Sequence, residues 1–151
     1  MAGTWLLYAK AKKYLGTGVM KLDASAFKMQ LHGAAASATI KELQTRSTNA
    51  SVLGEICATG GYVAGGKSFV PKWTVGVSAK QYKFTMSTVG LTFTASNASL
   101  KSIKYALIRN STSAAGGKVL CFCTLSTGAF SIVSPNTLTI LPAATGLFVL
   151  S

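Results

Sequence analysis

The stretch KSIKYALIRNSTSAAGGKVLCFCTL, residues 101–125, consists of two apolar runs joined by a loop of small and polar residues. In the first run Ile103, Tyr105 and Leu107 recur at every second position, which is the period of one face of a β-strand. The second run is apolar on both faces, with Val119, Cys121, Cys123 and Leu125 on one and Leu120 and Phe122 on the other. A strand with two apolar faces lies at the centre of a domain or under a neighbouring chain. The rest of the chain is therefore expected to cover this pair.

Shorter runs with the same alternation recur at residues 27–32, 73–78, 82–86, 91–95, 130–133, 138–141 and 147–150. Turn-forming residues bound each run, and Val89-Gly90 fits a tight connection between the two runs beside it. Eight or nine short strands at about ten-residue spacing predict an all-β fold of the β-sandwich or jelly-roll type. In the earliest run, Lys28, Gln30 and His32 alternate with apolar residues and are expected to face solvent.

The N-terminal segment has the spacing of an amphipathic helix. The residues that share one helical face are Trp5, Tyr8, Ala11 and Leu15. With Thr4 as a suitable cap, the sequence predicts a short helix over about residues 5–15. Lys10, Lys12 and Lys13 fall in its last turns, where the helix dipole favours cations. These lysines are either solvated or in contact with an acidic partner.

The charge of the chain is strongly positive. Fifteen Lys and Arg stand against three Asp and Glu, for a formal net charge of +12. Seven of the basic residues precede residue 50, seven more lie between Lys67 and Arg109, and only Lys118 follows. Salt bridges within the chain cannot neutralise this excess, so it implies an acidic partner, which is nucleic acid or an anionic protein or membrane surface.

A chain of 151 residues is expected to form one domain, so residues 1–151 are assigned to a single β-sandwich with strands from about 27 to 150. The uncharged segment after Lys118 contains prolines, glycines and polar residues, so we expect neither a spanning helix nor a membrane partner. The sequence has no signal-peptide pattern, which favours a cytoplasm as the site of synthesis. Cys57, Cys121 and Cys123 lack a CxxC spacing and are expected to be reduced and mostly buried.

Catalysis is not expected. A single histidine and the three acids Asp23, Glu42 and Glu55 do not suffice for a Ser/His/Asp set, a carboxylate pair or a magnesium site. Residues 61–68 match the phosphate-loop pattern GxxxxGK[ST], but Pro71 prevents the helix that such a loop requires. We therefore predict no enzyme activity, no cofactor and no metal.

A nucleic-acid interface would combine basic side chains with stacking aromatic rings on one face of a sheet. Lys83 stands beside Tyr82 and Phe84, and Lys104 stands beside Tyr105. Because neighbouring side chains of a strand point to opposite faces, these rings are expected in the core and the lysines outside it. A structural assembly protein fits the charged front and the neutral tail better, and nucleic acid stays as the alternative partner.

Five segments occur in an order that resembles a family of small virion proteins of tailed phages. They are AGTWLLYAKAKKYLG, LDASAFKMQL, GEICATGGYVAGG, KYALIRN followed by KVLCFCTL, and TLTILPAATGLFVLS. The resemblance covers almost the whole chain and implies a β-sandwich or jelly-roll protein that decorates or cements a capsid. The turns carry Ser, Asn and Lys where the family has Asp, so a cement protein this basic is expected to dock on an acidic shell.

The resulting hypothesis is a non-enzymatic capsid cement, or decoration, protein that binds and stabilises the shell of major capsid protein. It implies a homo-oligomer, dimer or trimer, located in a virion that is assembled in the host cytoplasm. The residues predicted to contact the capsid are Lys10, Lys12, Lys13, Lys28, Lys67 and Lys72. The alternatives are a basic nucleic-acid-associated virion protein and a tail or head-completion protein.

Overall fold

The computed structural model describes residues 4–23, 26–41, 54–76, 78, 80–86, 89–112, 117–144 and 146–150. In chain order its elements are β1 (Trp5–Leu7), α1 (Ala9–Gly16), β2 (Phe27–Gly33), the 3-10 helix η1 (Ala34–Ala36), α2 (Ser37–Ile40), β3 (Lys67–Phe69), β4 (Lys72–Val75), β5 (Tyr82–Thr85), β6 (Leu91–Thr94), β7 (Leu100–Asn110), β8 (Val119–Thr124), β9 (Phe130–Ile132), β10 (Thr137–Ile140) and β11 (Phe148–Leu150). The strand pairings among these residues are antiparallel. The predicted all-β, sandwich-like fold with a short N-terminal helix is confirmed.

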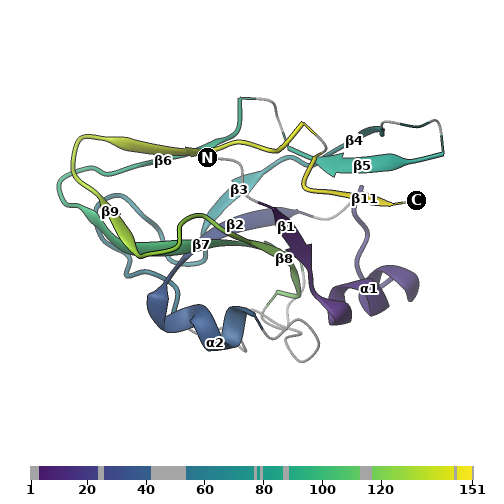
Figure 1. The fold of residues 1–151 in the computed structure, drawn as a ribbon, viewed down its shortest axis with the longest axis horizontal. Coiled ribbons are helices and arrows are strands. Elements are labelled where there is room, and N and C mark those ends of the chain that lie inside the picture. The colour runs from purple at the N-terminus through teal and green to yellow at the C-terminus, as the bar shows by residue number, and fades with distance from the viewer. Residues whose placement is uncertain are drawn as a thin grey trace.

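The strands form two layers (Figure 1). The six-stranded sheet has the order β1-β8-β7-β2-β3, and β9 pairs with β7 outside this path. The two-stranded sheet β10-β6 and the three-stranded sheet β11-β5-β4 lie over one face of it, which we call the sandwich face. Helices α1 and α2 lie on the other side, which we call the helix face (Figure 1). The large sheet is therefore covered on both faces.

The predicted pair of apolar runs forms strands β7 and β8 at the centre of the six-stranded sheet. Leu107 lies opposite Phe122, and Ile108 lies opposite Cys121. Every residue of β8 except Thr124 is buried. Strand β8 carries apolar side chains on both of its faces, one facing the sandwich side and the other the helix side. Its sequence therefore matches its central position.

An aromatic cluster joins the two layers. The ring of Phe84 on β5 lies 5.5 Å from that of Phe27 on β2 and 5.0 Å from that of Phe148 on β11. Trp73 on β4 completes the cluster, with its ring 5.5 Å from that of Phe84. Phe27 and Phe84 are fully buried. Since aromatic side chains bury large apolar areas, this cluster holds the three-stranded sheet on the sandwich face.

The N-terminal prediction is correct only in part. Residues Trp5–Leu7 form strand β1, which pairs with the outer edge of β8, and the Tyr8 amide extends this pairing by donating to the Leu120 carbonyl at 3.1 Å. Helix α1 therefore begins at Ala9, and its N-cap is Tyr8 in an extended conformation, not Thr4. The apolar residues of this segment fit either period, and pairing with the edge of a buried strand decides in favour of the strand.

The prediction that alternate residues of β2 face solvent is wrong. Gln30 and His32 are fully buried and Lys28 is half-buried. They lie on the helix face, where His32 is opposite Tyr105 and the layer of η1 and α2 covers the sheet. The Tyr105 hydroxyl is hydrogen-bonded to the Ser37 hydroxyl of α2 at 2.7 Å. Alternation identifies the two faces of a strand, but it does not reveal a second covering layer.

The expected tight connection between β5 and β6 does not form a hairpin. Strand β5 pairs with β4 and β11, whereas β6 pairs with β10 in a different sheet. Gly90 has a positive φ of 73°, and a side chain there would collide with the Ile140 carbonyl of β10. Gly90 therefore allows the chain to approach the backbone of β10, a strand much later in the sequence. It does not serve a two-residue turn between β5 and β6.

Candidate interaction surface

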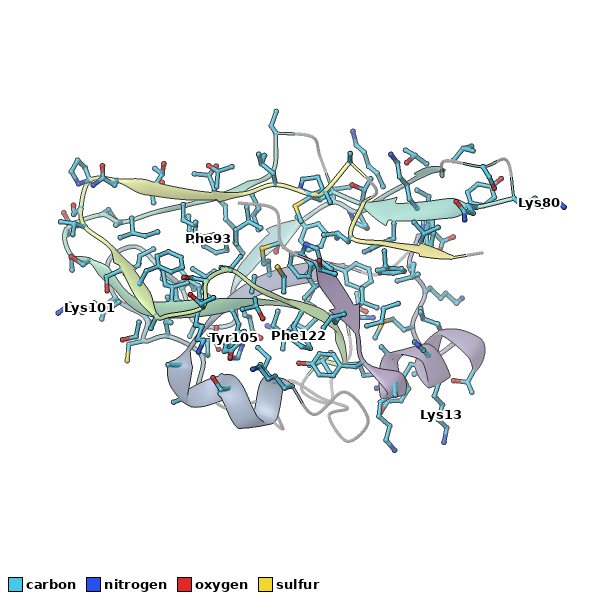
Figure 2. The ribbon with its side chains drawn as sticks, viewed as in Figure 1. Lys13, Lys80, Phe93, Lys101, Tyr105 and Phe122 are labelled. Carbon is cyan, nitrogen blue, oxygen red and sulfur yellow. The ribbon has the colours of Figure 1, made fainter. Side chains whose placement is uncertain are left out.

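Three of the predicted contact residues, Lys10, Lys12 and Lys13, are exposed on α1. The ring of Tyr8 lies 5.5 Å from that of Phe122 and anchors the start of this helix to the large sheet. Lys13 points away from the sheets (Figure 2). Of the three lysines, Lys13 is the one in the last helical turn, so the dipole argument applies to it and not to the other two.

A row of cations continues from α1 across the helix face. Lys28 of β2 lies opposite Arg109 of β7, and the Lys118 carbonyl accepts a 2.8 Å hydrogen bond from the neighbouring Asn110 amide. The Lys118 ammonium lies 5.3 Å from the centre of the Tyr14 ring, which belongs to α1. Like charges on neighbouring strands repel each other, so this row favours the approach of an anion. We refer to Lys10, Lys12, Lys13, Lys28, Arg109 and Lys118 together as the basic surface.

The side chains of the other two predicted contact residues lie on other faces than the basic surface. Lys67 is exposed on the edge strand β3, and its ammonium donates a 2.8 Å hydrogen bond to the Thr92 carbonyl of β6. Lys72 is exposed on β4, and its side chain alternates with that of Trp73 and so projects from the outer face of the three-stranded sheet. The six predicted lysines therefore do not share one face. Lys67 lies opposite Met29, next to Lys28 in the register of β2 and β3, but its side chain is on the sandwich face.

The aromatic residues beside lysines are only partly as predicted. Phe84 and Tyr105 are fully buried, but Tyr82 is exposed at the start of β5, where the three-stranded sheet extends past the large sheet. Lys104 does not point away from its neighbour, because its ammonium lies 5.6 Å from the centre of the Tyr105 ring. A flexible lysine stem can fold back over an adjacent residue, which strand alternation does not take into account. The buried Tyr105 ring is not accessible for stacking on a nucleotide base.

The glycine-rich loop after Gly54 continues the outer edge of β2 beyond β3. The Ile56 amide donates to the Leu31 carbonyl at 3.0 Å, and the Gly33 amide donates to the Gly54 carbonyl at 2.8 Å. Glu55 lies opposite His32 in an isolated antiparallel bridge. These bonds satisfy backbone groups that an open sheet edge would leave unpaired.

A buried tyrosine fastens this loop to the sheet. The Tyr62 hydroxyl accepts a 3.1 Å hydrogen bond from the Leu31 amide and donates a 2.6 Å hydrogen bond to the Glu55 carboxylate. The same carboxylate accepts from the Gly65 amide at 2.7 Å, and Arg109 donates to the Gly65 carbonyl at 3.0 Å. Burial raises the pKa of the Tyr62 hydroxyl well above its usual range, and the hydrogen bond to Glu55 raises it further. One of the three acids of the chain thus has a structural role.

The segment that resembles a phosphate loop leads into strand β3, Lys67–Phe69, and not into a helix. A side chain on Gly66 would collide with the Met29 carbonyl, so this glycine lets the loop approach β2 and not a phosphate group. The segment and β6 line an open groove of about 480 Å³ that contains Lys67, Ser68 and Thr94. The segment therefore leads into a strand and not into a helix, and this strand, β3, was not predicted from the sequence.

Replacing Tyr62 with phenylalanine is expected to lower the free energy of unfolding by roughly 1–3 kcal/mol, because the Leu31 amide and the Glu55 carboxylate each lose a partner in a largely buried place. Urea denaturation followed by fluorescence would measure the change. Tyr82→Phe removes a hydroxyl from an exposed ring and is the matched control. Equal stabilities for the two variants would contradict the structural role of the Tyr62 hydroxyl.

The three thiols do not share one environment. Cys121 and Cys123 are buried in β8, as predicted, but Cys57 is exposed, so the prediction that it is buried is wrong. Cys57 follows directly after Ile56, whose amide pairs with β2, and its own side chain projects outward from this edge. Burial raises the pKa of the Cys121 thiol well above its usual value, and the neighbouring Cys123 raises it further.

The native protein is expected to react with one equivalent of a thiol reagent at neutral pH and with three after denaturation. Cys57 is accessible, whereas Cys121 and Cys123 are shielded and Cys121 has a raised pKa, which lowers its thiolate fraction. Timed labelling followed by mass spectrometry would count and locate the modified residues. Rapid native labelling of Cys121 or Cys123 would contradict the buried position of β8.

In the described part of the chain, no three His, Cys, Asp or Glu residues are grouped so that they could hold a metal ion. The helices of the same part are too short or too polar to cross a membrane. Comparisons of the chain with protein-family models, with curated proteins and with solved structures found no match.

Proposed function

We propose that the chain is a non-enzymatic capsid cement protein of a tailed phage, which binds the acidic surface of the major capsid protein and stabilises the shell. The observation that carries the proposal is the basic surface. Its cations belong to α1, to β2 and β7 and to the residue directly before β8, so the fold fixes the spacing of their backbone positions. A fixed set of positions for like charges suits a partner with a complementary set of opposite charges.

The chain has too few acidic residues to neutralise its basic residues, which supports binding to an anionic partner. The chain has fifteen basic residues and three acids. The carboxylate of Glu55 is occupied by the Tyr62 hydroxyl and the Gly65 amide. Most of the positive charge therefore remains available to a partner, and the resulting field would speed the encounter with an acidic surface.

A protein partner is preferred to nucleic acid because of where the aromatic rings lie. Single-strand binding uses exposed rings as stacking platforms beside cations. Phe84 and Tyr105 are instead buried in the core, and exposed Tyr82 lies on the three-stranded sheet. The ring of Tyr14, on α1, is half-buried and already has the Lys118 ammonium 5.3 Å from its centre. An exposed apolar residue such as Val75 suits a contact with another protein better than a contact with phosphates.

The proposal includes self-association and location. A cement protein gains shell affinity by repeating modest contacts through symmetry, so we infer a homo-oligomer, dimer or trimer, that matches the symmetry of the capsid. Its place is the virion, and assembly takes place in the host cytoplasm. The motif resemblance supports the choice of a shell over a tail or a head-completion site.

The test is rebinding of the purified protein to capsids from which it has been stripped. We expect saturable co-sedimentation with these shells and recovery of their resistance to heat, in the presence of excess duplex DNA as competitor. Capsids that have kept their cement protein are the control, because their sites are occupied. Failure to bind stripped shells, together with tight binding to the competitor DNA, would overturn the proposal in favour of a nucleic-acid-associated virion protein.

A further inference from the structure

Strand β4 forms an open edge of the three-stranded sheet. The order of this sheet is β11-β5-β4, so β4 lies on the side of β5 that is away from β11. Among the described residues, β4 pairs with β5 and with no other strand. An edge strand presents backbone donors and acceptors that can pair with a further strand.

The register identifies which backbone groups face outward. The Gly76 amide donates to the Gln81 carbonyl at 2.8 Å, so these two residues are a hydrogen-bonded antiparallel pair. Hydrogen-bonded and non-hydrogen-bonded pairs alternate along an antiparallel ladder. Val75 and Tyr82, which lie opposite each other next to that pair, are therefore a non-hydrogen-bonded pair, and so are Trp73 and Phe84. The N–H and C=O groups of Trp73 and Val75 consequently point toward the open edge.

An apolar strip accompanies these free backbone groups. Val75 is 58% exposed and Tyr82 is 56% exposed, and both lie on the face that carries Trp73 and Phe84 further inward. The inner part of this face is core, and the outer part extends past the large sheet (Figure 1). Proteins protect open sheet edges from pairing with other chains by placing prolines, bulges or charged residues there. Within β4 the only such residue is Lys72, the first residue of the strand. The edge is suited to a strand of a partner.

Charge complementarity selects the kind of strand. Lys72 is the first residue of β4, and exposed Lys80 lies in the connection to β5, at the outer end of the three-stranded sheet (Figure 2). A cation therefore lies near each end of the open edge. A second copy of this chain paired at this edge would bring its own Lys72 and Lys80 close to the same cations. An extended segment with acidic residues at its ends and apolar residues between them would satisfy the cations, the strip and the backbone groups together.

We propose that β4 accepts an extended, acidic segment of the major capsid protein as an added antiparallel or parallel strand. This inference rests on the proposed function. It adds which strand of this chain makes one of the contacts and which kind of segment of the partner binds there. The added strand would pair with the outward groups of Trp73 and Val75 and would cover Val75 and Tyr82. Lys72, which the sequence placed at the capsid contact, would lie at the end of this strand.

The decisive variant is Val75→Pro. Proline removes the outward N–H of residue 75, but it leaves the bonds between β4 and β5 intact because Val75 belongs to a non-hydrogen-bonded pair. We expect its affinity for stripped shells to fall by about tenfold or more, since an amide hydrogen bond and close approach of the strand are both lost.

Two further variants serve as controls. Val75→Thr keeps the N–H and reduces only the apolar contact, so it is expected to weaken binding by about threefold. Val133→Thr changes an exposed valine outside this sheet and should bind as the original chain does.

A second measurement does not depend on any variant. Hydrogen exchange of the original protein should slow at the amides of Trp73 and Val75 when shells are bound, because these N–H groups gain partners. Shell binding that is unaffected by Val75→Pro, with unchanged exchange at both amides, would overturn the inference and leave the proposed function standing. Absence of binding to stripped shells would overturn both. Self-association of the free protein that Val75→Pro abolishes would replace the acidic segment by a second copy of this chain.

Discussion

Phe84→Ala is expected to lower the free energy of unfolding by about 3–5 kcal/mol, which is the largest stability effect that we predict for a single substitution. Phe84 is fully buried, and its ring is in contact with the rings of Phe27, Trp73 and Phe148. Its removal would leave a cavity where the three-stranded sheet meets the large sheet. Guanidinium denaturation, followed by circular dichroism and by tryptophan fluorescence, would measure the loss.

The matched control is Tyr82→Ala, because Tyr82 lies two residues earlier on the same face of β5. Tyr82 is more than half exposed, so its removal is expected to change the free energy of unfolding by no more than about 1 kcal/mol. Comparable losses for the two variants would mean that the outer half of the three-stranded sheet is packed. That outcome would also argue against an open strip beside β4.

The fold class could be predicted from the sequence because two-residue alternation is a local signal. Residues 103–107 carry apolar side chains at every second position and residues 119–125 are apolar on both faces, and the structure places the two runs as neighbouring strands β7 and β8. The C-terminal runs also correspond to strands, namely β9, β10 and β11. Alternation works where a strand must present an apolar face to a core, and nearly every strand of this chain does so.

The partners of these strands could not be predicted, because pairing depends on residues that are far apart in the sequence. Trp5–Leu7 has the spacing of a helix start, but it becomes a strand by pairing with β8 at the other end of the chain. The burial of Gln30 and His32 likewise depends on a helical layer that no local pattern of β2 reveals. Exposed Cys57 follows from the way its loop pairs with the edge of β2.

The candidate site was only partly accessible to sequence reasoning for the same reason. The three lysines of α1 are close in sequence, so their clustering could be anticipated. Arg109 and Lys118 lie on the same face as these lysines only because of the register of β2, β7 and β8, which cannot be predicted from the sequence. Lys67 and Lys72 satisfied the same criterion of positive charge, but the fold places them on edge strands away from α1.

Reversing the charge of Lys10, Lys12 and Lys13 to glutamate is expected to slow association with stripped shells by about tenfold to a hundredfold, while the dissociation rate changes much less. The three residues are exposed, and exposed charges act mainly by steering the encounter of two proteins. The matched control reverses Lys83, Lys101 and Lys104, which changes the net charge equally but lies on β5 and β7; Lys101 is far from Lys13 in Figure 2. Equal slowing by the two triple variants would mean that total charge matters and the basic surface does not.

Salt separates this electrostatic steering from binding to a polyanion. A protein that neutralises many phosphates releases their counterions, so its affinity for DNA falls by orders of magnitude between about 50 and 200 mM salt. A cement protein should lose its fast association over the same range but stay bound, because apolar contacts and strand pairing at β4 are screened little and recur by symmetry. We therefore expect retention on shells at roughly 300 mM salt, with little binding to duplex DNA under the same conditions. Loss of shell binding in parallel with DNA binding would assign the basic surface to nucleic acid.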